Sequence, residues 1–276
     1  MTLTIELRDL IMGTGTDYDV LVDGTNWRSI PDLRANRLNR SGRNGIQAGR
    51  DLLGGRPFQI SVQIAATDMA AALDAEEELA AAWAPSDIDL PIIVTDDSGT
   101  YRMFGRPQMA APNMDHADIG VITSECRFLA TDPIRYTDTE ASDSTTFPAG
   151  GVGFTFPFTF PLAFGTSGTG GVVSADNTGR KAVPWTATIT GPWTNPTITH
   201  VGLSRTLTIN VTLASGEVLT VDSKTRSILL NGTASRYSSL VQPASWFDLD
   251  SGVNEIRFGG ASGTGTAGLA WRSGSL

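Results

Sequence analysis

The chain has 276 residues, 40% of them apolar, and a net charge of −9 at pH 7. This length allows one large domain or two ordinary ones, with enough apolar residues to bury a core. The negative charge argues against bulk attraction to nucleic acid. The single cysteine excludes an intrachain disulfide, and no apolar run approaches the length of a membrane-spanning helix.

The first half predicts strands around one helix. Residues 57–64 and 2–8 alternate apolar and polar side chains with the period of a half-buried strand. Further strands are predicted at 18–22, 90–95, 101–106 and 119–129. Cys126 falls on the apolar face of the last of these and is predicted to be a core residue rather than a nucleophile.

The helix is predicted between Thr67 and Trp83. Thr67 or Asp68 can cap its first turn, and Pro85 ends it. Helical spacing predicts a buried stripe of Met69, Leu73, Ala80 and Trp83. The outer side would carry Glu76, Glu77 and Glu78, either as a solvated face or as a salt-bridging subunit contact.

Residues 34–56 differ from their surroundings because they carry six basic residues and a single acid, Asp51. The basic residues are Arg34, Arg37, Arg40, Arg43, Arg50 and Arg56. The stretch is too rich in glycine for a helix, and long loops of this kind are usually functional. The remainder of residues 1–135 has 19 acids and 6 bases, so a second copy would offer an acidic surface. We therefore predict a basic arm at a subunit interface; a nucleic-acid patch is the alternative, disfavoured because no aromatic residue lies between the arginines.

A Ser, Thr, Asp and Gly-rich stretch predicts a linker over residues 136–153 between domains 1–135 and 154–276. The second domain is predicted to be all β. It begins with the alternating stretch Phe154–Pro161 and continues with strands at 187–190, 206–213, 218–222, 227–230, 245–249, 254–258 and 268–272. Short strands at this spacing favour a two-sheet sandwich of jelly-roll type.

Catalytic and metal-binding patterns are sparse. His116 and His200 fall in different domains without metal-ligand spacing, and no Gly-x-Ser-x-Gly motif supports a hydrolase. Asp17, Asp19 and Asp23 form a solvated strand edge more readily than a calcium site. We predict no enzyme activity, cofactor or metal. Trp193, in a Pro-rich turn, is the candidate for an exposed platform that stacks on sugar.

Two stretches resemble the distal tail proteins (Dit) of siphophages. Phe128–Pro133 followed by Tyr136 resembles the junction that closes their N-terminal domain. The segments Gly216–Asp222, Asn231–Gly232 and Leu249–Phe258 are similar to their C-terminal galectin-like sandwich. The resemblance covers nearly the whole chain, although its motifs mark turns and core positions rather than a binding site.

The resemblance implies a mainly β protein with one helix. Its first domain would be a ring-forming barrel or sandwich related to tail-tube subunits, and its second a jelly-roll sandwich. It implies a homo-hexameric ring at the distal end of the virion tail, between the tail-tube protein and the tail-associated or fibre protein. DNA would pass through the bore without specific binding, and nothing would insert into a membrane. The alternative is a carbohydrate-binding adhesin acting through the second domain.

Overall fold

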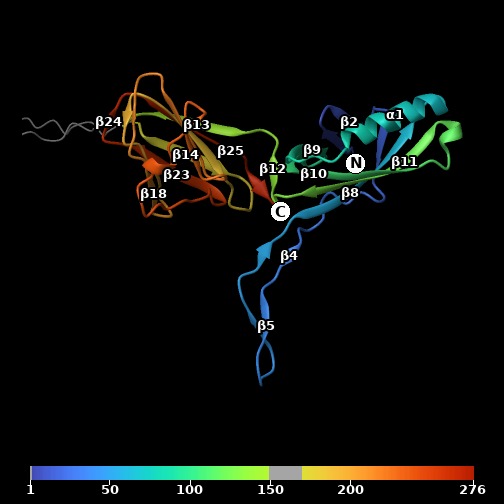
Figure 1. Ribbon diagram of the computed structural model, residues 1–276, viewed down its shortest axis with the longest axis horizontal. Helices are drawn as coiled ribbons and strands as arrows, with labels where there is room; N and C mark the ends of the chain where they lie inside the picture. The colour runs from blue at the N-terminus through green and yellow to red at the C-terminus, as the bar shows by residue number, and fades with distance from the viewer. Residues whose placement is uncertain (1, 149–169) are drawn as a thin grey trace, which may run out of the picture. The chain divides into compact units, whose positions relative to one another are not determined.

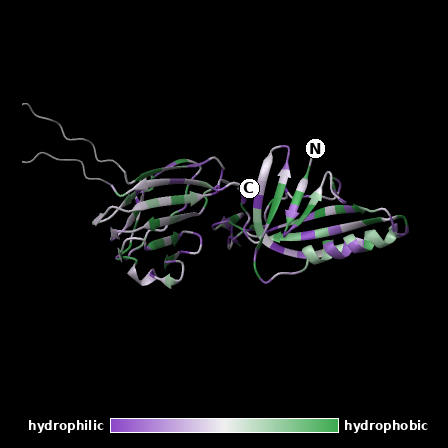
Figure 2. Cartoon of the chain, turned by 90° about the horizontal axis from the view of Figure 1, so that it is seen from above, coloured by the Kyte–Doolittle hydropathy of each residue, from purple (hydrophilic) through white to green (hydrophobic). Residues whose placement is uncertain are grey.

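The computed structural model describes residues 2–148 and 170–276, so the predicted segment Phe154–Pro161 lies outside the described residues. The described part is mainly β with one α-helix, as predicted. It forms two compact units, which comprise Met1–Asp138 with Leu276 (unit 1) and Thr139–Ser275 (unit 2). Figure 1 shows the elements of each unit, and Figure 2 shows hydrophobic and hydrophilic residues alternating along their strands.

Unit 1 contains twelve strands, one α-helix and one 3-10 helix in the part of the chain that is described. They are β1 (Thr4–Leu7), β2 (Leu10–Gly13), β3 (Tyr18–Leu21), β4 (Leu33–Arg34), β5 (Arg37–Asn39), β6 (Ile46–Ala48), β7 (Leu52–Leu53), β8 (Arg56–Ala65), α1 (Met69–Ala82), β9 (Leu90–Asp96), β10 (Gly99–Asn113), η1 (Ala117–Ile119), β11 (Val121–Ala130) and β12 (Arg135–Thr137).

The main sheet of unit 1 is antiparallel and curls almost into a barrel. Its order is β2-β1-β9-β10-β11-β8-β3, with β12 also paired to β10. The end strands β2 and β3 lie close together, which protects the two sheet edges. Helix α1 packs on β8, β10 and β11, and the core that it helps to cover is contributed by the apolar faces of these elements.

The sequence pattern of β8 is confirmed, because Phe58, Ile60, Val62 and Ile64 are all buried. The helix begins after Asp68, whose side chain accepts a hydrogen bond from the Ala71 N–H at 2.9 Å. Its buried face is rotated from the predicted stripe. The fully or nearly buried residues are Ala72, Leu79, Ala82 and Trp83, whereas Met69 is 49% exposed because it stands at the first helical position.

The described residues of unit 2 form short strands and one 3-10 helix. They are β13 (Ala141–Thr146), β14 (Val172–Asn177), β15 (Trp185–Thr190), β16 (Trp193–Thr194), β17 (Thr197–His200), β18 (Arg205–Thr208), β19 (Thr212–Leu213), β20 (Val218–Asp222), β21 (Ser227–Leu230), β22 (Ala234–Ser235), η2 (Tyr237–Ser239), β23 (Gly252–Gly259), β24 (Ser262–Gly263), β25 (Thr266–Trp271) and β26 (Gly274–Ser275).

Two sheets of unit 2 have the orders β13-β25-β15-β20-β21-β22 and β14-β23-β17-β18, and a small sheet has the order β19-β16-β24. Asn254, on β23, is 3% exposed and has both ends of its amide engaged. Its Nδ2 donates to the carbonyls of Asp250 and Gly252, and its Oδ1 accepts from the Asp250 N–H at 3.0 Å. This residue therefore holds the turn before β23, which explains the place of Asn254 two residues after Gly252 in the segment Leu249–Phe258.

Two expectations for the second half differ from the structure. Residues 136–153 were predicted as a linker, but Ala141–Thr146 forms β13, an edge strand paired with β25. Polar Ser, Thr and Asp side chains suit such a strand because one of its sides faces solvent. Residues 245–249 form no strand. Only Leu249 makes a bridge, to Val183.

Candidate assembly surface

The basic stretch of the sequence forms a two-stranded ribbon instead of a loop. Strand β4 pairs with β7 and β5 pairs with β6, so residues 33–53, which we call the arm, fold back on themselves. The turn at the end includes Gly42 and Gly45, both with positive φ. In Figure 1 the arm extends from the start of β8 and away from the main sheet of unit 1.

The arm exposes both charge and apolar surface. Arg34, Arg37, Arg40, Arg43 and Arg50 are exposed, and together with Asp51 they give the arm a net charge of +4. Leucine and isoleucine side chains are also exposed on it: Leu33, Leu38, Ile46 and Leu52. An isolated two-stranded ribbon is marginally stable in water, and contiguous exposed apolar groups mark interaction surfaces. The arm is therefore a candidate for contact with another chain.

Arg56 does not belong to this surface, contrary to the sequence prediction. It is 1% exposed and lies at the root of the arm. Its Nη2 donates to the Pro133 carbonyl at 2.7 Å and its Nη1 to the Ser29 carbonyl at 2.8 Å. Burial, and secondarily the charge of Arg135, lowers the pKa of Arg56 to about 10, so the group stays protonated at neutral pH. Arg56 therefore anchors the arm instead of contacting a partner.

The root of the arm is also braced by backbone bonds and by a neighbouring cluster. The Asp32 N–H donates to Gly55 O at 3.0 Å and the Gly54 N–H to Asp32 O at 2.6 Å. Nearby, the Arg28 guanidinium lies 4.6 Å from the Trp27 ring centroid and bridges to Asp96 at 2.5 Å. Burial alone would raise the pKa of Asp96, but hydrogen bonds from Ser98 and Arg28 lower it. The root is thus fixed while the arm beyond it is exposed.

The rest of unit 1 is strongly acidic. Residues 1–32 and 54–138 carry 20 acids against 7 arginines, a net charge of −13. Some of these acids serve the fold. The Tyr18 hydroxyl, on β3, donates to Glu78 on α1 at 2.6 Å, and burial together with this bond raises the pKa of Tyr18. Others, such as Asp74 and Glu77 on α1, are exposed.

Trp193 is not an exposed sugar platform. It is 1% exposed, its Nε1 donates to the Gly259 carbonyl at 2.9 Å, and its ring packs edge-on against Phe147 with centroids 4.8 Å apart. The Pro-rich turn suggested exposure, but β16 pairs with both β19 and β24 and turns the indole inward. The predicted carbohydrate role of Trp193 is therefore wrong.

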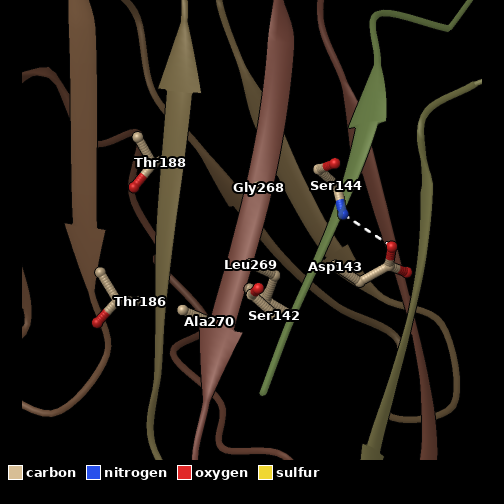
Figure 3. Close-up of a pocket in the computed structure, with 8 residues that line it drawn as sticks. All are labelled: Ser142, Asp143, Ser144, Thr186, Thr188, Gly268, Leu269 and Ala270. Carbon is tan, nitrogen blue, oxygen red and sulfur yellow. Dashed lines mark hydrogen bonds between the residues drawn. The ribbon is translucent and has the colours of Figure 1, made fainter. Parts of the chain in front are cut away.

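Unit 2 has a shallow groove on the outer face of its larger sheet (Figure 3). Its floor includes Gly268 on β25, and its sides carry hydroxyl groups from β13 and β15, among them Ser144 and Thr188. Asp143 is the ionisable residue among those that line it. Its two carboxylate oxygens accept backbone N–H groups of Ser144 and Ser174 at 2.8 and 3.2 Å. The lining residues therefore provide no pair of converging acid and base groups.

The other residues with potential chemistry have structural roles. The buried His200 ring has its Nε2 at 2.9 Å from Asn254 Oδ1, and its Nδ1 accepts the Leu203 N–H at 3.2 Å. Cys126 is buried as predicted. Among the described residues, no group of three His, Cys, Asp or Glu side chains is arranged to hold a metal ion. Over the same residues, no helix has the length and hydropathy to cross a membrane.

Comparison with known proteins connects these features to phage tails. Residues 178–273 match the family described as siphovirus-type tail component, C-terminal domain. A search of curated protein sequences finds no significant match.

Solved structures resemble the chain over its whole length. The Dit protein of phage SPP1, described as a paradigm of the hub adsorption apparatus in phages that infect Gram-positive hosts, superposes with a TM-score of 0.70 at 15% identity, covering 100% of both chains. A chain of the phage P2 baseplate, in its activated conformation with Ca, superposes with a TM-score of 0.57 at 7% identity, covering 99% of this chain and 97% of that one. At these identities the likeness establishes the fold. The family model matches residues 178–273 within unit 2 and the fold likeness extends over both units, so the chain is similar to siphophage tail proteins of the Dit type.

Proposed function

We propose that the chain forms a homo-hexameric ring at the distal end of a siphophage tail, through contacts of its arm with neighbouring copies. The ring would join the tail-tube protein to the tail-associated or fibre protein. The observation that carries the proposal is the arm, in which charged and apolar side chains are exposed together on a ribbon with a fixed root. The hexameric number comes from the resemblance to Dit proteins.

The charge of unit 1 also supports a passage for DNA. With a net charge of −13 outside the arm, unit 1 would surround a bore with carboxylates, and these repel phosphates and prevent DNA from adhering. The alternative function, a sugar-binding adhesin, depended on an exposed Trp193, and this residue is buried. We therefore retain assembly as the proposed function and do not propose adhesion.

The proposal is tested by measuring the mass of the purified protein in solution over a range of concentrations. We expect a discrete ring that becomes monomeric in the variant Arg37→Glu/Arg40→Glu/Arg43→Glu, because each arm then repels the acidic body of the next copy. The variant Arg180→Glu/Arg226→Glu/Arg257→Glu is the matched control, since it reverses three exposed arginines of unit 2. A wild-type protein that stays strictly monomeric at high concentration, with no other tail protein present, would count against the ring.

A further inference from the structure

We infer that the arm of one copy docks on a specific acidic and apolar surface of the next copy, at the opposite end of unit 1, so that the contact is head-to-tail. This inference rests on the proposed function and names the acceptor of the arm. We call the acceptor the tip patch. It lies where the β10–β11 connection meets the start of α1, and it consists of Asp68, Met69, Met114, Asp115, Asp118 and Ile119.

The two segments of the tip patch are fastened to each other. The Ala66 N–H donates a hydrogen bond to the Gly120 carbonyl at 2.9 Å. Ala66 lies two residues before the helix cap Asp68, and Gly120 directly follows η1. Gly120 has a φ of 79°, and a Cβ there would lie 2.5 Å from the Ala66 carbonyl oxygen. The 3-10 helix is therefore held against the start of α1, and the two lie side by side in Figure 1.

The surface chemistry of the tip patch complements that of the arm. Met69, Met114 and Ile119 are 49, 43 and 66% exposed, which is unusual exposure for large apolar side chains. The three aspartates around them are also exposed, and no lysine or arginine lies among residues 66–101 or 107–126. The arm offers the converse arrangement, because Leu38 and Ile46 are exposed among arginines. Docking would bury apolar groups on both sides and pair opposite charges at the rim.

An arm cannot reach the tip patch of its own chain. Strand β8 begins at Arg56, where the arm is rooted, and ends at Ala65, beside the tip patch. Ten residues of strand separate the two ends by about 30 Å, and the arm leaves in a direction away from the sheet (Figure 1). Only another copy can bring an arm and a tip patch together.

The distribution of charge favours this contact over the symmetric ones. The arm has a net charge of +4 and the rest of unit 1 has −13, so two arms repel each other, as do two bodies, whereas an arm attracts a body. When each pair of copies shares one such contact, the contact is heterologous and continues from copy to copy until it closes. The arm and the tip patch then specify a ring or a helical array, whereas a reciprocal exchange of arms would stop at a two-fold dimer, which a mass measurement distinguishes from a ring.

The test uses charge reversal on the full chain. Arg37→Glu/Arg40→Glu/Arg43→Glu reverses the arm, and Asp115→Lys/Asp118→Lys reverses the tip patch while leaving the Asp68 cap intact. Asp74→Lys/Glu77→Lys changes the charge by the same amount on the exposed side of α1 and is the control. We expect either reversal alone to raise the concentration of half-assembly by roughly tenfold or more, as the loss of two or three exposed ion pairs predicts. The control should assemble like the wild type.

Mixing gives the decisive result. In an equimolar mixture of the two reversed variants, each arginine arm meets an aspartate patch and each glutamate arm meets a lysine patch. At a protein concentration at which neither variant assembles alone, we expect the mixture to form assemblies in which the variants alternate, seen by native mass spectrometry. A tip-reversed protein that assembles like the wild type overturns the tip patch while the ring itself stands, and so does a mixture that stays monomeric. A monomeric wild type would instead remove the proposed function.

Discussion

Cys126 shows how a single residue can be assigned from its place in a strand. It lies in β11, opposite Ile60 of β8 and Ala110 of β10, and it is fully buried. Burial raises the pKa of its thiol to about 12, because the thiolate would be placed in an apolar core. A nucleophilic or metal-binding cysteine needs the opposite, a stabilised thiolate that solvent can reach.

We therefore predict that Cys126 resists alkylation in the folded protein. With iodoacetamide between pH 7 and 10, native labelling should stay slow, whereas unfolded protein should label faster as the pH passes the ordinary thiol pKa of about 8.5. Mass spectrometry of samples taken over time, with and without denaturant, measures both rates. Rapid labelling of the native protein at pH 8 would show that the thiol is accessible, contrary to its burial.

At the scale of elements, β8 is the clearest strand that was predicted from alternation and is confirmed by the structure. In β8, four apolar residues share one buried face, and a period of two is specific for such a strand. Strand β10 was predicted only over residues 101–106, but it runs over Gly99–Asn113. The arm gave no strand signal at all, since its exposed residues have no buried face to impose alternation.

The candidate assembly surface, too, could be predicted from the sequence only in part. The concentration of arginine in residues 34–56 indicated a surface for another chain, and five of the six arginines are exposed. The burial of Arg56 could not be predicted, because its partners are the carbonyls of Ser29 and Pro133, which only the fold brings together. The tip patch could not be predicted from the sequence either, because it joins residues 68–69 to residues 114–119, which are far apart in the chain.

The close packing of β10 against β11 depends on one glycine. Gly105 pairs with Leu90 of β9 and with Ala130 of β11, so it stands where the strand passes from one neighbour to the other. A Cβ at this position would lie 2.1 Å from the Leu129 carbonyl oxygen and 2.5 Å from the Ala130 Cα. Both contacts are with backbone, which cannot move without breaking the pairing of β10 and β11.

We predict that Gly105→Ala destabilises unit 1 by about 2–3 kcal/mol, in the range of overpacked core substitutions. Gly268→Ala is the comparison, because a Cβ there meets only the Asp143 carbonyl oxygen, at 3.8 Å. Chemical denaturation followed by tryptophan fluorescence measures both variants. Equal stability of Gly105→Ala and the wild type would mean that β10 can shift at this point.

At the scale of the whole molecule, the net charge is confined to one unit. Unit 1 carries −9, and unit 2 has as many acids as bases, so the electrostatics of association belong to unit 1. Two electrostatic interactions between copies of unit 1 oppose each other. Whole copies repel through their net charge, while the arm, at +4, is attracted to the acidic body of a neighbour.

The distance over which each interaction acts determines how much added salt weakens it. The centres of two such units are separated by roughly 30 Å or more, several times the Debye length of about 10 Å at 0.1 M salt, so their mutual repulsion is already screened. Contacts between arm and tip patch act over a few ångströms and persist until the Debye length falls to about 3 Å at 1 M.

We therefore predict that raising sodium chloride from 0.1 to 1 M shifts the wild-type protein from assembled to monomeric, as measured by light scattering at fixed protein concentration. The arm-reversed variant, which we expect to be monomeric already at 0.1 M, should not change with salt, because it lacks the attraction that salt removes. If apolar contacts of the arm dominated instead, assembly would strengthen or stay constant at high salt, and the arginines would have to be assigned another role.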